Sequence, residues 1–234
     1  MTLVVLAHGT NDPAGRATWG ALLTRVRALL PDVGVRLAWA GVARPQLADL
    51  LPKLPSGPVD AERGGAGPSG VVVVPAFLAS GFHVRRDVPE QLASLGRDDV
   101  VVTEPLGPDA VLVDAALSRL RAARWTDQQV VLAAAGSTDP VAQADLRVAA
   151  DLVRERVGGE VPVGYVAGGD PRLADVVAAQ DGPVALLTWL LAPGVFHRWA
   201  SGVGAAVVAE PLGDHPAVAS LLVERYRASV ALAS

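Results

Sequence analysis

The sequence predicts an α/β protein of two tandem doubly wound lobes, each a four-stranded parallel sheet with helices on both faces. Three observations predict this fold: short apolar runs alternate with helical patterns, the first half of the chain recurs in the second, and 51% of the 234 residues are hydrophobic. Alternation of strand and helix is typical of parallel sheets. The charged share of 19% and the high apolar content exclude a largely disordered chain.

The internal repeat rests on four pairs of matching segments, which occur in the same order in both halves. They are LVVLAHGTNDP (3–13) with VVLAAAGSTDP (130–140), PQLADLL (45–51) with PRLADVV (171–177), VVVVPAFLASG (71–81) with VALLTWLLAPG (184–194), and EPLG (104–107) with EPLG (210–213). We therefore expect one lobe at 1–125 and a second, degenerate copy at 126–234, divided in the polar stretch 122–129.

The elements of the first lobe follow from the hydrophobic pattern. Continuous apolar runs, as in parallel strands covered on both faces, predict strands at Leu3–Ala7, Val35–Ala40, Val71–Pro75 and Val100–Thr103. Apolar residues three and four apart predict a helix over 13–30, with Asp12 as its N-cap and Pro13 in its first position. The Gly/Pro-rich segment 55–70 is absent from the second copy and predicts a mobile surface insertion.

Composition excludes several function classes. The chain has no cysteine, which excludes disulfides, thiolate nucleophiles, iron–sulfur clusters and cysteine-bound zinc. The net charge of −4 argues against nucleic-acid and anionic-membrane partners. No apolar run approaches the roughly 18 residues of a spanning helix, and the start of the chain lacks a basic signal-peptide region, so we expect a cytoplasmic protein.

Two histidines follow neighbouring strands of the predicted sheet. In a flavodoxin-like strand order, 2-1-3-4, strands 1 and 3 lie side by side, and ligands bind where the order reverses at their carboxyl ends. His8 directly follows the first strand, and His83 follows the third. In the second copy Ala135 replaces His8, and Phe196, followed by His197, replaces His83. We therefore expect the chemistry in the first copy and a structural role for the second.

The same residues carry a family resemblance. The segments AHGTNDP (7–13), P-x-L-A-D (45–49) and VVVVPAFLASGFHVRRDVP (71–89) resemble the sirohydrochlorin chelatases, and LLAPGVFHRWASG (190–202) with the EPLG repeat resembles their double-length members. The resemblance implies a chelatase-like fold and a lyase that inserts Co²⁺ or Fe²⁺ into sirohydrochlorin for siroheme or cobalamin. It also implies that His8 and His83 are the metal-binding, catalytic residues. A glutamate common after strand 2 in this family falls here on Gly41.

The proposed chemistry needs a loose metal site and a base. Two neutral imidazoles leave most coordination positions of a divalent ion open, and they would also accept Ni²⁺. Removing two pyrrole protons requires a base, for which the candidates are His8, His83, Asp87 and Glu104. Glu210 matches Glu104 in the second copy, so a structural role for both stays open. No organic cofactor is required.

Cations and hydroxyls near the histidines are the candidate contacts of the substrate. Sirohydrochlorin carries eight carboxylates, so we expect Arg85 and Arg86, and also consider Arg44, as their partners. Thr10 is a further candidate, although its counterpart Ser137 also suits a turn hydrogen bond. His197 is a candidate for a supporting or substrate role. His215 opens the last predicted helix and is expected to be structural.

The sequence leaves two alternatives to a chelatase. A non-catalytic metal or tetrapyrrole carrier of the same fold would fit the missing glutamate and the degenerate second copy. A histidine phosphatase would fit HGT after the first strand, but Ala7 stands where its phosphate-binding arginine is required. One chain supplies two lobes, so a monomer suffices, and a homodimer is the other oligomeric state considered.

Overall fold

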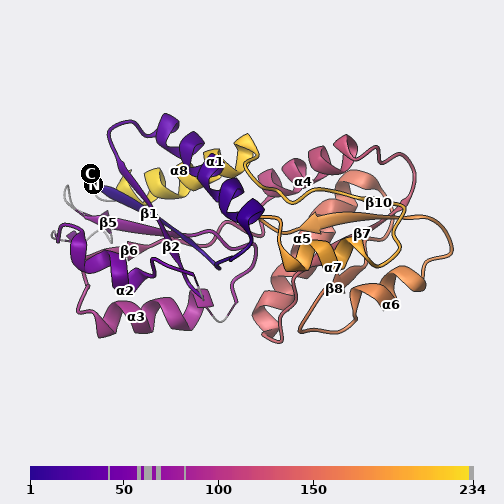
Figure 1. Cartoon of the computed structure of the whole chain (residues 1–234), viewed down its shortest axis with the longest axis horizontal. Helices are drawn as coiled ribbons and strands as arrows, with labels where there is room; N and C mark the ends of the chain where they lie inside the picture. Colours follow the sequence, from indigo (N-terminus) through magenta and orange to yellow (C-terminus); the bar gives the residue numbers. More distant parts are fainter. Residues whose placement is uncertain (42, 57–58, 61–64, 67–69, 82, 232–234) are drawn as a thin grey trace. The chain divides into compact units, whose positions relative to one another are not determined.

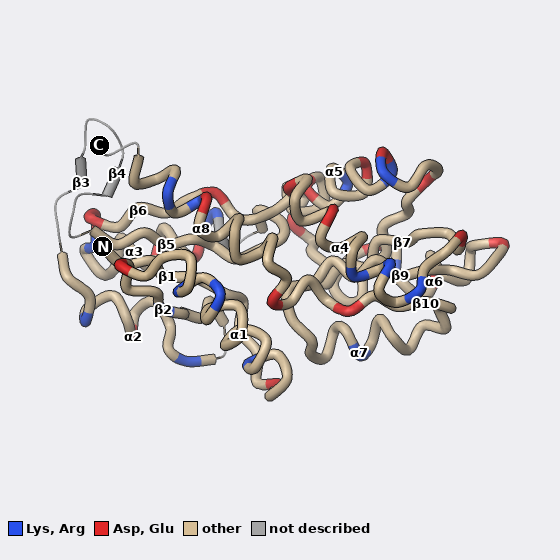
Figure 2. Tube along the Cα trace, turned by 90° about the horizontal axis from the view of Figure 1, so that it is seen from above, with Lys and Arg blue, Asp and Glu red and all other residues tan. Residues whose placement is uncertain are grey.

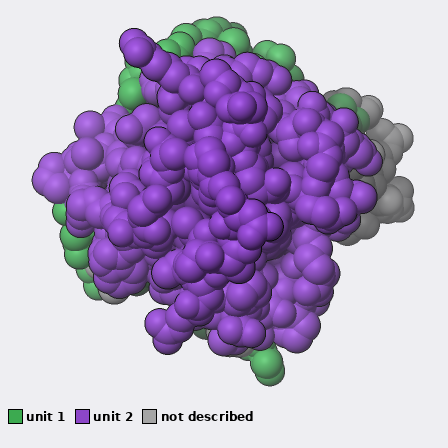
Figure 3. Space-filling model, turned by 90° about the vertical axis from the view of Figure 1, so that its right-hand side faces the viewer, with its two compact units in different colours: residues 1–11, 20–106, 219–234 green, residues 12–19, 107–218 purple. Residues whose placement is uncertain are grey.

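The protein is described by a computed structural model that covers residues 1–234. The described residues exclude 42, 57–58, 61–64, 67–69, 82 and 232–234, and the side chains of 59–60, 65–66, 83 and 84 are excluded as well. The chain divides into two compact units (Figure 3): Met1–Asn11, Gly20–Leu106 and Ala219–Ser234 form unit 1, and Asp12–Trp19 with Gly107–Val218 form unit 2. Each unit is built around its own sheet.

The sheet of unit 1 is parallel throughout and has the predicted strand order. It contains β1 (Thr2–Ala7), β2 (Gly34–Trp39), β5 (Val71–Pro75) and β6 (Val100–Val102), in the order β2-β1-β5-β6. β1 is hydrogen-bonded to both β2 and β5 along its length. The predicted strands are confirmed within one residue at each end, because continuous apolar runs mark strands buried on both faces.

The sheet of unit 2 repeats this order. Its strands are β7 (Gln129–Ala134), β8 (Val163–Tyr165), β9 (Val184–Trp189) and β10 (Val207–Val208), arranged β10-β9-β7-β8 and all parallel. The central strand β7 therefore corresponds to β1, and β9 corresponds to β5. The expectation of two tandem four-stranded parallel sheets is confirmed.

Helices cover both faces of the first sheet. In Figure 1, α1 (Pro13–Leu29) and α8 (Pro216–Ala231) lie on one face, and α2 (Leu47–Leu50) and α3 (Val88–Ser94) lie on the other. A buried cluster joins β1 and β5 to the α2 and α3 side, through residues such as Leu6, Val73 and Leu92. Alternate strand residues, such as Val5, are also fully buried, because both faces of the sheet are covered.

The second sheet is covered in the same way. The helices of unit 2 are α4 (Ala110–Ala122), α5 (Pro140–Val157), α6 (Leu173–Ala178) and α7 (Val195–Ser201). One core cluster joins Val131 and Leu186 of the sheet to Leu173 of α6 and Ala200 of α7. Helix α4 contacts α5 and β9. Acidic and basic residues are interspersed along α5 (Figure 2), and Arg154 forms an ion pair with Asp151 at 3.0 Å.

The last helix of each repeat packs in the unit of the other repeat. Helix α4 ends the first repeat but belongs to unit 2, whereas almost all of α8, which ends the second repeat, belongs to unit 1. Arg227 of α8 donates a hydrogen bond of 3.2 Å to the carbonyl oxygen of Leu29 at the end of α1. The two compact units therefore do not coincide with the two sequence repeats, because each unit contains the last helix of the other repeat.

Aspartate residues begin three of the helices, and the insertion contains a strand pair. Asp12, Asp109 and Asp139 each cap a helix by accepting a backbone N–H, as predicted for Asp12. Within 55–70, expected to be a loop, the structure describes a short antiparallel pair of β3 (Val59–Asp60) and β4 (Gly65–Ala66). Among the described helices, none is both long and apolar enough to span a membrane.

Candidate functional site

His8 stands at the carboxyl end of the central strand β1. The strand itself is buried from Leu3 to Ala7, and His8 is the first exposed residue after it. The segments that follow β2 and β5 are hydrogen-bonded to the end of β1: Ala40 N donates to Ala7 O at 2.7 Å, and Ala76 N donates to Leu6 O at 2.8 Å. The imidazole is therefore delivered where β1 leaves the sheet, which is where open α/β sheets bind ligands.

An aromatic contact places the His8 ring toward the β5 side. Its ring centroid lies 6.3 Å from that of Phe77, with the two planes inclined by 58°. Phe77 follows β5 by two residues and packs against the core under α2 and α3. Phe77, packed in the core, therefore lies against His8. This contact agrees with the prediction that strands 1 and 3 are neighbours in the sheet.

His83 begins a π-helical turn, η2 (His83–Asp87), which continues into α3. Its side chain lies outside the described residues, so the convergence of the two imidazoles stays a prediction. Single π-helical turns are rare and are frequent at functional sites. The matching segment of the second copy, α7, is an ordinary α-helix in which Phe196 takes the place of His83.

Gly41, the expected place of the family glutamate, lies against the backbone of His8. A Cβ atom built on Gly41 would be 2.8 Å from the His8 carbonyl oxygen, so no side chain fits there unless the backbone moves. The Gly41 carbonyl accepts a hydrogen bond of 2.6 Å from the side-chain amide of Gln46. A close backbone contact therefore replaces the carboxylate at this position.

Arg44 is paired with Asp49 close to this contact. The guanidinium donates to both carboxylate oxygens, and the backbone N–H of Gln46 donates to the same carboxylate at 2.9 Å. The Gln46 N–H bond, followed by the Arg44 hydrogen bond, lowers the pKa of Asp49 below its ordinary value. The structure thus gives Arg44, considered above for substrate carboxylates, a partner of its own.

The other candidate substrate contacts lie on exposed positions. Arg85 donates through Nε to the Ser80 carbonyl at 3.1 Å, and the Nε of Arg86 lies 3.4 Å from the Glu90 carboxylate. Both arginines are exposed, and so is Glu104, directly after the short strand β6. These contacts are local and leave Arg85 and Arg86 accessible from solvent, so their role toward a substrate stays a prediction.

Thr10 and Asp87 lie in the chain segments that carry His8 and His83. Thr10 follows Gly9, whose φ of 109° favours glycine, and Asp87 stands at the start of α3. In the second copy Ser137, the counterpart of Thr10, accepts a hydrogen bond of 3.0 Å from Asp139 N. That bond confirms the turn role expected for Ser137, and the substrate role of Thr10 stays a prediction.

The remaining histidines make structural contacts. His197 Nε2 lies 3.2 Å from the carbonyl oxygen of Ala209, and since a carbonyl only accepts, this nitrogen carries the proton. His215 Nδ1 accepts a hydrogen bond of 3.2 Å from Ala217 N at the start of α8. The prediction of a helix-start role for His215 is confirmed, while a substrate role for His197 stays a prediction.

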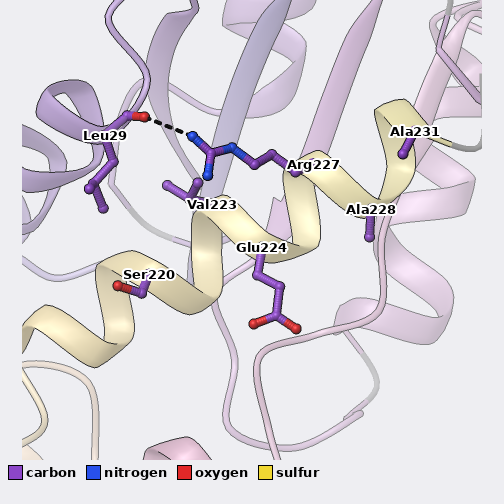
Figure 4. A pocket seen from close by; sticks show the side chains of 7 residues that line it. All are labelled: Leu29, Ser220, Val223, Glu224, Arg227, Ala228 and Ala231. Atoms are coloured by element: carbon purple, nitrogen blue, oxygen red, sulfur yellow. Dashed lines mark hydrogen bonds between the residues drawn. The ribbon is translucent and has the colours of Figure 1, made fainter. Parts of the chain in front are cut away.

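Metal-binding clusters and surface grooves among the described residues do not add a second candidate site. Among the described side chains, no three of His, Asp or Glu lie together in a way that could hold a metal ion. A shallow groove of about 450 Å³ runs along α8 beside the end of α1 (Figure 4), where Leu29, Glu224 and Arg227 line it. None of the candidate site residues belongs to its lining.

The contacts of three neighbours of the candidate site were not predicted from the sequence. They are Phe77, Gly41 and Gln46, and each contacts either His8 or a residue that contacts it. In the second copy their places are taken by Leu190, Ala167 and Arg172. Comparison of the two halves marks these positions as different, but it does not show what the residues contact.

Comparisons with known proteins agree with this architecture. The model of the CbiX family matches residues 2–123 and 129–229. A solved structure of SirB from Bacillus subtilis with Fe³⁺ is similar over 98% of this chain and 95% of its own, with a TM-score of 0.77 and 21% identity. A structure of CbiX, described as the terminal enzyme for siroheme biosynthesis in denitrifying bacteria, is similar over 97% and 98%, with a TM-score of 0.68 and 25% identity.

Curated relatives are matched over parts of the chain. The sirohydrochlorin ferrochelatase of Priestia megaterium is 28% identical over 117 residues, which are 47% of this chain and 44% of that protein. The sirohydrochlorin cobaltochelatase of Methanosarcina acetivorans is 24% identical over 132 residues, 52% of this chain and 95% of that protein. The match thus covers less than half of the ferrochelatase and nearly all of the cobaltochelatase. Since the family model matches both halves of this sequence, the chain belongs to the CbiX family.

Proposed function

We propose that this protein is a sirohydrochlorin chelatase, a lyase that inserts Co²⁺ or Fe²⁺ into the tetrapyrrole. The observation that carries the proposal is the exposed His8 at the carboxyl end of β1, held beside Phe77, in a chain of the CbiX family. The names of the matched relatives, a ferrochelatase and a cobaltochelatase, support this substrate and these metals. The product would serve siroheme or cobalamin synthesis.

In this proposal His8 and His83 hold the metal as a substrate before it is transferred. Neutral imidazole nitrogens bind Co²⁺ and Fe²⁺, and also Ni²⁺, and two of them leave most coordination positions open. An incomplete ligand set favours release of the ion to the four nitrogens of the macrocycle. Of the two histidines, His8 is the one whose side chain the structure describes. In the proposal it supplies one ligand of the ion and His83 supplies the other.

Insertion replaces two pyrrole protons by one divalent ion, so two protons must leave the macrocycle. The close contact of Gly41 with the His8 carbonyl argues against a base at that place. Asp87 at the start of α3 and the exposed Glu104 after β6 are the carboxylates proposed to receive them, together with the histidines themselves. A neutral imidazole has one free lone pair, so in this proposal each histidine can accept a proton only after it has released the metal.

We assign substrate contacts to Arg85, Arg86 and Thr10 in the first repeat. The exposed guanidinium groups suit the eight carboxylates of sirohydrochlorin, because charge-assisted pairs with carboxylates are strong and directional. Residues 1–125 are then the catalytic repeat, and residues 126–234 form a degenerate repeat that lacks the imidazole of strand 1. No organic cofactor takes part in the proposed reaction.

An absorbance assay with sirohydrochlorin and Co²⁺ or Fe²⁺ tests the proposal. His8→Ala and His83→Ala are each expected to reduce insertion at least tenfold, whereas His215→Ala, at the start of α8 and outside the candidate site, serves as the matched control. Unchanged activity in both site variants would overturn the assignment. Tight retention of the metal in calorimetry without any insertion would favour the carrier instead.

A further inference from the structure

The two repeats offer an internal comparison for the surroundings of His8. Their backbones correspond closely at the ends of the second strands: Trp39 N donates to Pro45 O at 2.9 Å in one copy, and Tyr165 N donates to Pro171 O at 3.0 Å in the other. Likewise, Ala40 N donates to Ala7 O, and Val166 N donates to Ala134 O at 2.9 Å. These bonds align Gly41 with Ala167 and Gln46 with Arg172.

The first difference between the copies is the missing side chain at Gly41. A Cβ there would lie 2.8 Å from the carbonyl oxygen of His8, closer than real Cβ atoms approach an oxygen. In the second copy, where Ala135 stands in the place of His8, the aligned residue Ala167 carries a Cβ. The absence of a side chain therefore accompanies the copy that has the imidazole.

The second difference is the amide of Gln46. Its Nε2 donates to the Gly41 carbonyl at 2.6 Å, and its own backbone N–H is held by the Asp49 carboxylate at 2.9 Å. Asp49 also accepts the Arg44 guanidinium. Gln46 is thus fixed at both ends and can hold Gly41 against the backbone of His8. In the second copy the aligned residue is Arg172, which has no carboxamide.

From these contacts we infer that Gln46 and Gly41 are positioning residues for His8, which set its backbone and hence the direction of its imidazole toward the metal. The inference rests on the proposed function, since it assumes that His8 binds the ion. The Asp49 carboxylate fixes Gln46, the Gln46 amide fixes the Gly41 carbonyl, and the bare Gly41 Cα lets the His8 carbonyl approach. Groups that orient a metal ligand commonly change metal affinity 10- to 100-fold when they are removed.

Binding of Co²⁺ alone, followed by its visible absorption, tests the inference on the full chain. Gln46→Leu removes the amide at similar size, and Gly41→Ala adds the Cβ that would meet the His8 carbonyl. Each is expected to weaken Co²⁺ binding about tenfold or more and to change the ligand-field bands of the bound ion. The matched controls are Arg172→Leu and Ala167→Gly in the second repeat, which are expected to leave binding at the wild-type level.

A second measurement does not depend on the metal. The imidazole carbon–proton resonance of His8, assigned by its loss in His8→Ala, is expected to shift in Gln46→Leu and Gly41→Ala and to stay in place in both controls. Circular dichroism and thermal melting identify any variant that unfolds. If one of the variants Gln46→Leu and Gly41→Ala unfolds, the other tests the inference.

The outcomes separate this inference from the proposed function. If His8→Ala loses Co²⁺ while Gln46→Leu and Gly41→Ala bind it within about twofold of the wild type and leave the His8 resonance in place, the inference is wrong and the metal site stands. If His8→Ala itself binds Co²⁺ like the wild type, the proposed function fails.

Discussion

Arg198 donates a hydrogen bond to the carboxylate of Asp12, although 186 residues separate them along the chain. The other oxygen of the same carboxylate accepts the backbone N–H of Ala14 at 2.9 Å and thereby caps α1. The bond to Arg198 is the main cause that lowers the pKa of Asp12 below its ordinary value. A residue of the second repeat thus contacts the start of the helix that follows the His8 loop.

The Asp12 pair predicts a loss of stability in acid. Because the pKa of Asp12 is lower in the folded chain than its ordinary value of 3.8, the ionised form stabilises the fold above about pH 4, and this contribution disappears as the pH falls through the folded pKa. Urea unfolding at pH 7 and pH 3 should show a smaller acid loss in Asp12→Asn than in the wild type. Arg198→Gln should reduce the loss as well, and an unaltered pH dependence in both variants would contradict the prediction.

Gly136 should be among the least replaceable residues of the second repeat. Its φ is 117°, and an added Cβ would lie 1.4 Å from the carbonyl oxygen of Ala167. Gly136→Ala is therefore expected to lower the free energy of unfolding by about 3 kcal/mol or more, through strain and displaced backbone. Gly182, with nothing within 4 Å of its Cβ position, is the control, and Gly182→Ala should change the unfolding free energy by about 0.5 kcal/mol at most. Equal losses in chemical denaturation would refute the steric argument.

Placing a glutamate at position 41 should not create a working base. The first side-chain carbon of Gly41→Glu would meet the His8 carbonyl at 2.8 Å, so the backbone of His8 would have to move before any carboxylate could act. Insertion of Co²⁺ into sirohydrochlorin is expected to fall about tenfold or more below the wild-type rate. A rate above that of the wild type would show that the loop adapts and that a carboxylate there suffices.

Arg97 should contribute strongly to the stability of unit 1. It is only 9% exposed and donates to the carbonyls of Leu51 and Pro55 and to the carboxylate of Asp99. Arg97→Leu removes these hydrogen bonds and the ion pair from a nearly buried place and is expected to lower the unfolding free energy by about 3 kcal/mol.

The control for Arg97 is an exposed ion pair. Arg154 and Asp151 lie 3.0 Å apart, one helical turn from each other on α5, and such pairs contribute about 0.5 kcal/mol or less. Arg154→Ala should therefore leave the urea midpoint almost unchanged. A similar midpoint shift for both variants would mean that burial does not decide the contribution of these arginines.

Much of the fold could be predicted from local patterns. Strands such as β1 and β5 are continuous apolar runs, and Asp12 and Asp139 mark helix starts by a mechanism that is local to the chain. The exchange of α4 and α8 between the units could not be predicted, because an apolar helix face does not specify which of two similar sheets it will cover.

The candidate site was predictable only in part. His8 could be identified because the second repeat keeps Gly136 but has Ala135 before it. The contacts of Gly41 and Gln46 depend on how closely two backbone segments approach, which residue spacing does not express. The same holds for the π-helical turn at His83–Asp87, whose sequence is compatible with an ordinary helix.

The place of α8 has a consequence for synthesis of the chain on the ribosome. Unit 1 begins with β1, but the helix that completes it follows every strand of unit 2. Until the last helix has been translated, the face that α8 shares with α1 is therefore only partly covered, and apolar surface of the nascent first repeat stays exposed to solvent for that interval.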